Sequence, residues 1–95
     1  MPFTAENIRL LKGLGFTENE ATLYFELLKS GKTDAKMLSE FLLIGSTATY
    51  RILDELQKKG MVEKEPTIPL KFKAVAPSIG LQNAVTQKFE SLKKI

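Results

Sequence analysis

The sequence predicts a mainly α fold with a small β-hairpin wing: a winged helix-turn-helix with an N-terminal helix and a long C-terminal helix. Two observations predict this fold. Residues 33–62 have the pattern of a helix, a tight turn, a second helix and a terminating glycine. A short segment in which polar and apolar residues partly alternate follows directly, as expected for a β-hairpin. Because 95 residues can form one modest core and not two, we expect a single domain over residues 1–95.

Caps and apolar spacing predict the first two helices. Thr4 can cap the first, whose apolar residues include Ile8 and Leu11. The second begins with a capping box, in which the side chains of Thr17 and Glu20 each accept a hydrogen bond from the other residue's amide. Apolar residues then recur at helical spacing, so this helix should be the centre of the core: Ala21, Leu23, Tyr24, Phe25, Leu27 and Leu28.

The helix-turn-helix is expected over about residues 34–59. Each of its helices has one apolar face, and the two faces should pack together. The first face is formed by Ala35, Leu38 and Leu42, and the second by Thr49, Ile52, Leu53 and Leu56. Residues 43–46 leave room only for a sharp turn, and Gly60 can end the second helix in a left-handed conformation. Lys58 and Lys59 should complement the carbonyl end of the helix dipole.

The wing is expected over about residues 61–75. Two strand candidates flank Pro66 and Pro69, which cannot both lie within a paired ladder and therefore mark the tip of the hairpin. Ile68, between the two prolines, has three candidate contacts: a DNA minor groove, a partner protein, or the domain itself. We rank partner or self contact first.

The last helix is expected over about residues 78–95. It carries an apolar stripe formed by Leu81, Val85, Phe89 and Leu92. A small domain has little spare core to cover such a stripe, whereas a second copy of the chain would bury it. We therefore expect a homodimer through this helix. The alternative is that the stripe packs on the first helix of the same chain.

The composition excludes most familiar enzyme sites. The chain has no cysteine and no histidine, so it lacks the ligands of a typical zinc site, a cysteine nucleophile and an imidazole base. No glycine-rich phosphate loop is present, and the 11 acidic residues lie mostly on expected polar helix faces. We therefore expect no enzyme activity, no metal and no cofactor.

Charge and hydropathy suggest a protein of the cytoplasm. A net charge of +3 permits nucleic-acid binding. No apolar run approaches the roughly 18 residues that a membrane-spanning helix needs, and residues 1–11 lack the layout of a signal peptide. We expect a cytoplasmic location without membrane contact.

An ordered set of short motifs runs through most of the chain. Residues 14–21, Leu-Gly-Phe-Thr-Glu-Asn-Glu-Ala, are followed by Tyr24 at helical spacing. Downstream, residues 58–62 are Lys-Lys-Gly-Met-Val, and residues 72–75 are Phe-Lys-Ala-Val. This set resembles the N-terminal DNA-binding domain of the TrmB family of archaeal transcriptional regulators, over about residues 10–92.

The resemblance implies a winged-helix domain that binds double-stranded DNA as a dimer and regulates transcription in an archaeon. Larger members of the family carry a C-terminal domain that binds sugars. A chain of 95 residues has no room for one. We therefore carry over DNA binding and expect no small-molecule effector domain.

The chain departs from the family pattern in its turn and in its charges. The family commonly has glycine at the position of Leu43, where a non-glycine residue in the left-handed conformation costs about 1–2 kcal/mol. Gly45 would relieve this strain by shifting the turn. Four positions that are often basic in the family are uncharged here, which thins the charge available for phosphates: Ser46, Ala48, Ile68 and Leu70.

The start of the second helix of the pair is expected to enter the major groove. Its core-facing residues fix its rotation so that Ser46, Thr47, Tyr50 and Arg51 point outward. Arg51 can bind guanine or a phosphate, and the two hydroxyl residues can reach a base edge or a backbone oxygen. The alternatives are a solvated Arg51 and a Tyr50 that packs under the wing.

Three lysines are expected to contact the DNA backbone. Lys36 lies near a helix start, where the helix dipole also favours a phosphate. Lys71 and Lys73 share one face of the second wing strand, because residues two apart point the same way. The alternatives are plain solvation for Lys36 and protection of a strand edge for the two wing lysines.

The sequence therefore predicts a DNA-binding transcriptional regulator that binds duplex DNA as a homodimer. The recognition helix would lie in the major groove and the wing on the backbone. The alternative is a winged-helix module for protein–protein contact in a transcription-related assembly, which the uncharged helix start and the apolar wing tip favour.

Overall fold

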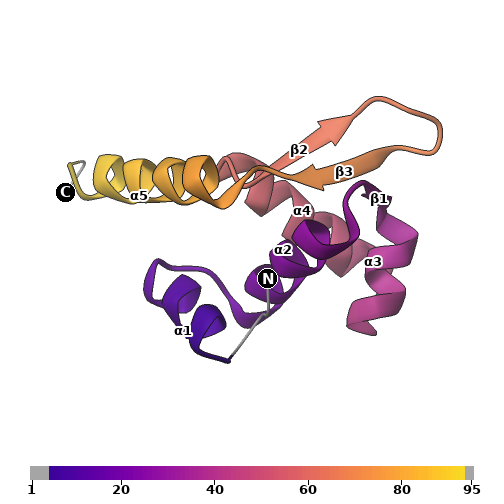
Figure 1. Ribbon diagram of the computed structural model, residues 1–95, viewed down its shortest axis with the longest axis horizontal. Coiled ribbons are helices and arrows are strands. Elements are labelled where there is room, and N and C mark those ends of the chain that lie inside the picture. The colour runs from indigo at the N-terminus through magenta and orange to yellow at the C-terminus, as the bar shows by residue number, and fades with distance from the viewer. Residues whose placement is uncertain (1–4, 94–95) are drawn as a thin grey trace.

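The computed structural model describes residues 5–93 as five helices and a small antiparallel sheet (Figure 1). The predicted winged helix-turn-helix fold is confirmed. In chain order the elements are α1 (Ala5–Gly13), α2 (Glu18–Ser30), β1 (Thr33–Asp34), α3 (Ala35–Leu42), α4 (Ser46–Lys58), β2 (Val62–Glu65), β3 (Lys71–Ala74) and α5 (Pro77–Lys93). The expected cap at Thr4 and the expected end of the last helix at Ile95 lie outside the described residues.

Helix α2 is the centre of the core, as predicted. Its capping box is present: the amide of Thr17 donates to Oε1 of Glu20 at 2.8 Å, and the amide of Glu20 donates to Oγ1 of Thr17 at 3.1 Å. The helix packs against α1, α3, α4 and β3, and its buried side chains include Leu23, Tyr24 and Leu27. The position of α2 therefore sets the positions of four other elements.

The sheet adds one short strand to the predicted hairpin. β3 lies between β2 and β1, and both pairs are antiparallel. β1 is two residues long, pairs Thr33 with Phe72, and leads directly into α3. It therefore ties the base of the wing to the helix-turn-helix.

A buried tyrosine connects α2 to the segment before α5. The hydroxyl of Tyr24 donates to the backbone oxygen of Val75 at 2.7 Å. Burial raises the pKa of Tyr24 to about 12, because the charged phenolate would lose its hydration. The hydroxyl therefore stays a hydrogen-bond donor well into the alkaline range, and its hydrogen bond fixes the point at which the chain enters α5.

The turn between α3 and α4 keeps its left-handed residue at Leu43. This residue has φ 57° and ψ 40° and is 90% exposed, whereas Gly45 has φ −69° and an extended conformation. The expectation that Gly45 would shift the turn is therefore wrong. The amides of Leu43 and Ile44 both donate to the backbone oxygen of Ser39, an ending that typically uses a left-handed residue.

Replacing Leu43 by glycine should stabilise the protein by about 0.5–1 kcal/mol. Glycine lacks the Cβ that opposes the left-handed conformation, and this gain exceeds its larger loss of backbone entropy on folding. The measurement is the free energy of unfolding in urea. Leu43→Ala is the matched control, since it shortens the exposed side chain but keeps the Cβ. Equal stabilities of the two variants would contradict the strain argument.

Candidate nucleic-acid interface

The core fixes the inner face of α4. Thr49, Leu53 and Leu56 are each less than 2% exposed, and the hydroxyl of Thr49 donates to the backbone oxygen of Gly45 at 3.0 Å. Because an α-helix turns by about 100° per residue, burial of these side chains directs the opposite side of α4 to solvent. This is the rotation that the apolar spacing predicts.

The outer face of α4 presents the four residues expected there: Ser46, Thr47, Tyr50 and Arg51 are all exposed. The guanidinium of Arg51 makes no ion pair within residues 5–93. The first turn of the helix has no acidic residue, and no described side chain caps it. Uncapped amides, hydroxyls and a guanidinium are groups that bind phosphate oxygens and base edges.

Further along α4, the charges cancel. Nζ of Lys58 lies 3.2 Å from Oδ2 of Asp54 and 3.6 Å from Oε1 of Glu55. The hydrogen bond to Asp54, together with the attraction of both carboxylates, raises the pKa of Lys58. In the described part of α4, Arg51 is therefore the cation that no carboxylate neutralises.

Tyr50 combines the two roles considered for it. Its side chain is half exposed on the outer face of α4, and its ring meets the ring of Phe72 edge-on, with centroids 6.4 Å apart. Phe72 is buried in β3. Tyr50 therefore joins α4 to the wing and still presents part of its side chain to solvent.

The two wing lysines have different surroundings. Lys71 and Lys73 lie across from Glu65 and Glu63 in the hairpin register. Nζ of Lys73 is 3.7 Å from Oε2 of Glu63 and 3.9 Å from Oε1 of Glu65, whereas Lys71 makes no ion pair with a described residue. The expected basic face is therefore mixed in charge, and Lys71 is its more available cation. The sequence did not reveal this, because the cross-strand pairs depend on the register.

Lys36 lies on the first turn of α3 and is exposed, with no ion pair among the described residues. The helix start is already capped, since Oδ1 of Asp34 accepts from the amide of Met37 at 2.9 Å. A carboxylate there competes with a phosphate for the positive end of the dipole. Lys36 follows closely after β1, and β1 pairs with the wing strand β3. In that pairing Asp34 lies opposite Lys71.

Lys59 has a role that its sequence position did not reveal. Its Nζ is 3.1 Å from Oε1 of the buried Glu20 and 4.4 Å from the centroid of the Phe16 ring. It also donates to the backbone oxygen of Gly15 at 3.4 Å. Instead of serving the end of its own helix, Lys59 joins that end to the start of α2.

Two amides of α5 hold the end of α4. Nδ2 of Asn83 donates to the backbone oxygen of Gly60 at 2.8 Å, and Nε2 of Gln87 donates to that of Lys58. Carbonyls at a helix end lack partners within the helix, so these bonds satisfy them. Gly60 has φ 73°, as predicted, and a Cβ there would lie 2.7 Å from Cβ of Asn83. Glycine thus provides both the left-handed stop and the close approach of α5.

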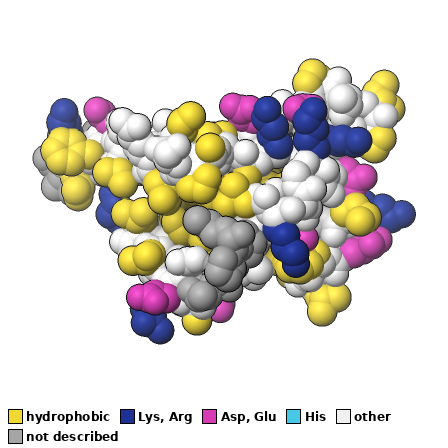
Figure 2. Space-filling view, viewed as in Figure 1, with side chains coloured by type: hydrophobic (Ala, Val, Ile, Leu, Met, Phe, Trp, Pro, Cys, Tyr) yellow, Lys and Arg dark blue, Asp and Glu magenta, His cyan; other side chains and the backbone are white. Residues whose placement is uncertain are grey.

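The apolar stripe on α5 is partly covered. Leu81 is half-buried and lines an apolar groove of about 390 Å³ together with residues that include Leu10 and Leu14. Figure 2 shows hydrophobic side chains gathered along α5 and in the hollow below it. The rest of the stripe is about half exposed or more, and it is formed by Val85, Phe89 and Leu92. Packing against the first helix region therefore accounts for Leu81 alone.

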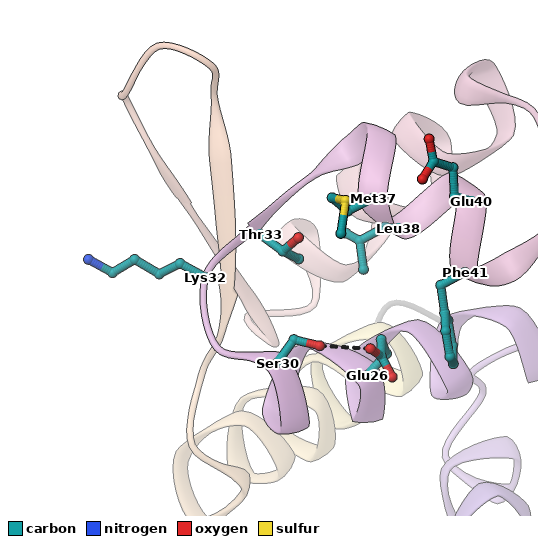
Figure 3. A pocket seen from close by; sticks show the side chains of 8 residues that line it. All are labelled: Glu26, Ser30, Lys32, Thr33, Met37, Leu38, Glu40 and Phe41. Atoms are coloured by element: carbon teal, nitrogen blue, oxygen red, sulfur yellow. Dashed lines mark hydrogen bonds between the residues drawn. The ribbon is translucent and has the colours of Figure 1, made fainter.

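A cavity of about 560 Å³ lies between α2 and α3 (Figure 3). Its lining includes Glu26 and Glu40, and the hydroxyl of Ser30 donates to Oε2 of Glu26 at 2.7 Å. Lys32 points away from the other lining side chains. Two carboxylates without an inward cation repel phosphate, so this cavity is not part of the candidate interface.

Other kinds of site find no support in the part of the chain that the structure describes. Residues 5–93 contain no group of three or more acidic side chains close enough together to hold a metal ion. None of the described helices combines the length and apolar character needed to cross a membrane.

The comparisons with known proteins agree on family and fold. The family described as "Sugar-specific transcriptional regulator TrmB" matches residues 11–78. No protein with a curated description matches the sequence significantly.

Among solved structures, the fold is similar to that of TrmBL2, described as an archaeal chromatin protein, with a TM-score of 0.78 and 24% identity. That match covers 94% of this chain and 35% of TrmBL2, so the chain spans about a third of that protein. Oxidised MarR from E. coli matches with a TM-score of 0.65 and 25% identity, over 88% of this chain and 66% of MarR. A mutant of S. aureus MepR, bound to an oligodeoxyribonucleotide, matches with a TM-score of 0.68 and 14% identity. That match covers 94% of this chain and 69% of MepR.

Lys59→Ala should lower the free energy of unfolding by about 1–3 kcal/mol, because it leaves the buried carboxylate of Glu20 without its ammonium partner. Urea unfolding measures this. Lys58→Ala is the matched control: it removes the same charge from the neighbouring exposed position and should change stability little. Similar losses in the two variants would contradict the structural role of Lys59.

Proposed function

Because this chain belongs to the TrmB family of transcriptional regulators, we propose that it binds duplex DNA and regulates transcription through the outer face of α4. The recognition helix would lie in the major groove and the wing on the DNA backbone. Family and fold are those of transcriptional regulators, which are not enzymes.

The observation that carries the proposal is the guanidinium of Arg51, which makes no ion pair with any residue between 5 and 93. It lies on the exposed face of α4, beside Ser46 and Thr47, whereas the other cation of this helix, Lys58, is paired with carboxylates. A guanidinium suits the two acceptors of guanine and also suits a phosphate. Arg51 would therefore supply the main directional contact.

Backbone contacts would come from Lys71 and Lys36, which have no ion pair among the described residues. Lys73 would contribute less, because Glu63 and Glu65 share its charge. Binding should therefore neutralise few phosphates per protomer. Such binding is of moderate affinity and falls off with salt in proportion to the number of phosphates contacted.

We further propose that the protein acts as a homodimer through the α5 stripe formed by Leu81, Val85, Phe89 and Leu92, of which the last three are exposed in the protomer. Two recognition helices would then enter successive major grooves, about one helical turn apart. The regulator would act in the cytoplasm, without a cofactor, and its archaeal source is an expectation from the family. Sugar binding is not carried over to this chain.

The second candidate is a module for protein–protein contact. The cancelled charges at Asp54 and Lys58 favour it, because they weaken the attraction of α4 to a polyanion. An apolar protein contact would be nearly insensitive to salt, which separates the two candidates.

Duplex binding, measured by fluorescence anisotropy over a salt series, tests the DNA proposal. The Arg51→Ala, Lys71→Ala double variant should bind at least about tenfold more weakly. Its log–log salt slope should become shallower by about 0.9 for each phosphate contact that is lost.

The matched control is the Arg9→Ala, Lys12→Ala double variant, which removes the same charge from exposed positions of α1. It should bind nearly as well as the wild type. If both double variants bind alike, the proposed DNA-contacting face is wrong. If the wild type fails to bind any duplex at low salt, the protein-contact candidate replaces the DNA proposal.

The Val85→Ser, Phe89→Ser double variant should be monomeric at micromolar concentration, where the wild type has twice the monomer mass in light scattering. These side chains are exposed in the protomer, so the loss reports on association and not on folding. Ile79→Ser is the control, because Ile79 is exposed on another side of α5. A monomeric wild type would refute the dimer.

A further inference from the structure

We propose that the wing tip, residues 66–69, inserts Ile68 into the minor groove of DNA as an apolar wedge and bends the duplex. The inference rests on the proposed DNA binding. It adds an apolar contact in the minor groove to the contacts of α4 with the major groove and of the lysines with phosphates. Apolar side chains that enter between base steps unstack them partly and kink the duplex by about 20–90° toward the major groove.

Ile68 is fully exposed in the folded protein. Pro66, Thr67 and Pro69 around it are exposed as well, so nothing in the described chain covers this tip. Of the two contacts ranked first for Ile68, the exposure overturns self contact, whereas partner contact stays untested. An apolar side chain at the far end of a hairpin is available to a ligand outside the protein.

The wing tip is held in one shape before any ligand arrives. The amide of Thr67 donates to the backbone oxygen of Glu65 at 2.8 Å, and its hydroxyl donates to the backbone oxygen of Pro69 at 2.8 Å. Two prolines within four residues further restrict the backbone. Little conformational entropy remains to be lost on binding, which favours insertion of a single side chain.

The tip is also fixed relative to the recognition helix. The ring of Tyr50 on α4 packs against Phe72 of β3, and the half-buried Leu70 packs on the core just behind the tip. Figure 1 shows the hairpin projecting beyond the helices, with its turn at the far end. If α4 occupies a major groove, this fixed projection points Ile68 at the flanking DNA.

The charge distribution along the hairpin fits a groove better than a flat surface. Residues 66–69 carry no charge. Behind them lie Lys71, which has no ion pair among the described residues, and Glu65, whose carboxylate is paired with Lys32 and Lys73. Figure 2 shows the same order, with hydrophobic side chains at the end of the hairpin and a mixture of basic and acidic side chains behind them. The uncharged tip can enter a groove between the phosphates of the two DNA strands. Lys71 would then lie close to those phosphates.

A protein partner fits the tip less well. Stable protein interfaces bury at least about 1,000 Å² in total, whereas one isoleucine offers on the order of 100 Å². A groove about 6 Å wide, by contrast, is filled by a single narrow loop. The size of the protrusion therefore favours DNA.

The test compares wild type and Ile68→Ser on a 30-base-pair duplex that carries A·T-rich segments, labelled at both ends for energy transfer. Anisotropy gives affinity and salt slope, and energy transfer gives the bend. Ile68→Ser should bind about tenfold more weakly with an unchanged salt slope, and the bend should be lost. Netropsin, which occupies the minor groove, should compete with the wild type more strongly than with the variant.

Ile79→Ser makes the same chemical change at an exposed site on α5 and should behave like the wild type. If the wild type binds but Ile68→Ser matches it in affinity and bend, the wedge is refuted while the proposed function stands, and a protein contact becomes the role of the tip. If the wild type binds no duplex, the proposed DNA binding and the wedge are both refuted. A salt slope that changes along with affinity would also refute an apolar contact.

Discussion

Helix α4 is held on three sides, and its remaining side faces solvent. Its inner face is buried with Leu53 and Leu56, its flank meets the wing through Tyr50, and its end is bound by Lys59 and by the α5 amides. Any shift of the helix would break contacts with α2, β3 or α5. The direction of its outer face is therefore a property of the whole fold and not of the helix alone.

The protein is basic overall, but several lysines on α4 and around the wing are paired with carboxylates. Lys58, Lys59 and Lys73 each lie within 4 Å of a carboxylate, as does Lys32, which is 3.1 Å from Glu65. The net charge of +3 therefore says little about the local charge of α4 and the wing, where lysines and carboxylates are paired. For DNA binding, the shape and hydrogen-bonding groups of the contacting surface then matter more than its electrostatic attraction, because fewer counterions are released on binding.

The sequence predicted the elements that depend on local patterns. Helical spacing located α2 and α4, the capping box located the start of α2, and the left-handed stop at Gly60 followed from its place after two lysines. Contacts that depend on long-range packing were missed. The pairing of Glu63 with Lys73 requires the hairpin register, and the contact of Lys59 with Glu20 joins residues 39 apart in the chain. The error at Gly45 has a similar cause, because the geometry of the α3 ending outweighed the preference of a single residue.

The bonds from Asn83 and Gln87 to the end of α4 have a consequence for the length of DNA that a dimer can read. These amides lie one turn apart on α5, so they resist both tilting and sliding of α4 relative to that helix. In the proposed dimer joined through α5, each recognition helix would keep a fixed position relative to the helix that joins the protomers, so the distance between the two would vary little. Such a protein would tolerate base changes between its two half-sites but not an inserted base pair, which moves one half-site by about 3.4 Å and rotates it around the duplex.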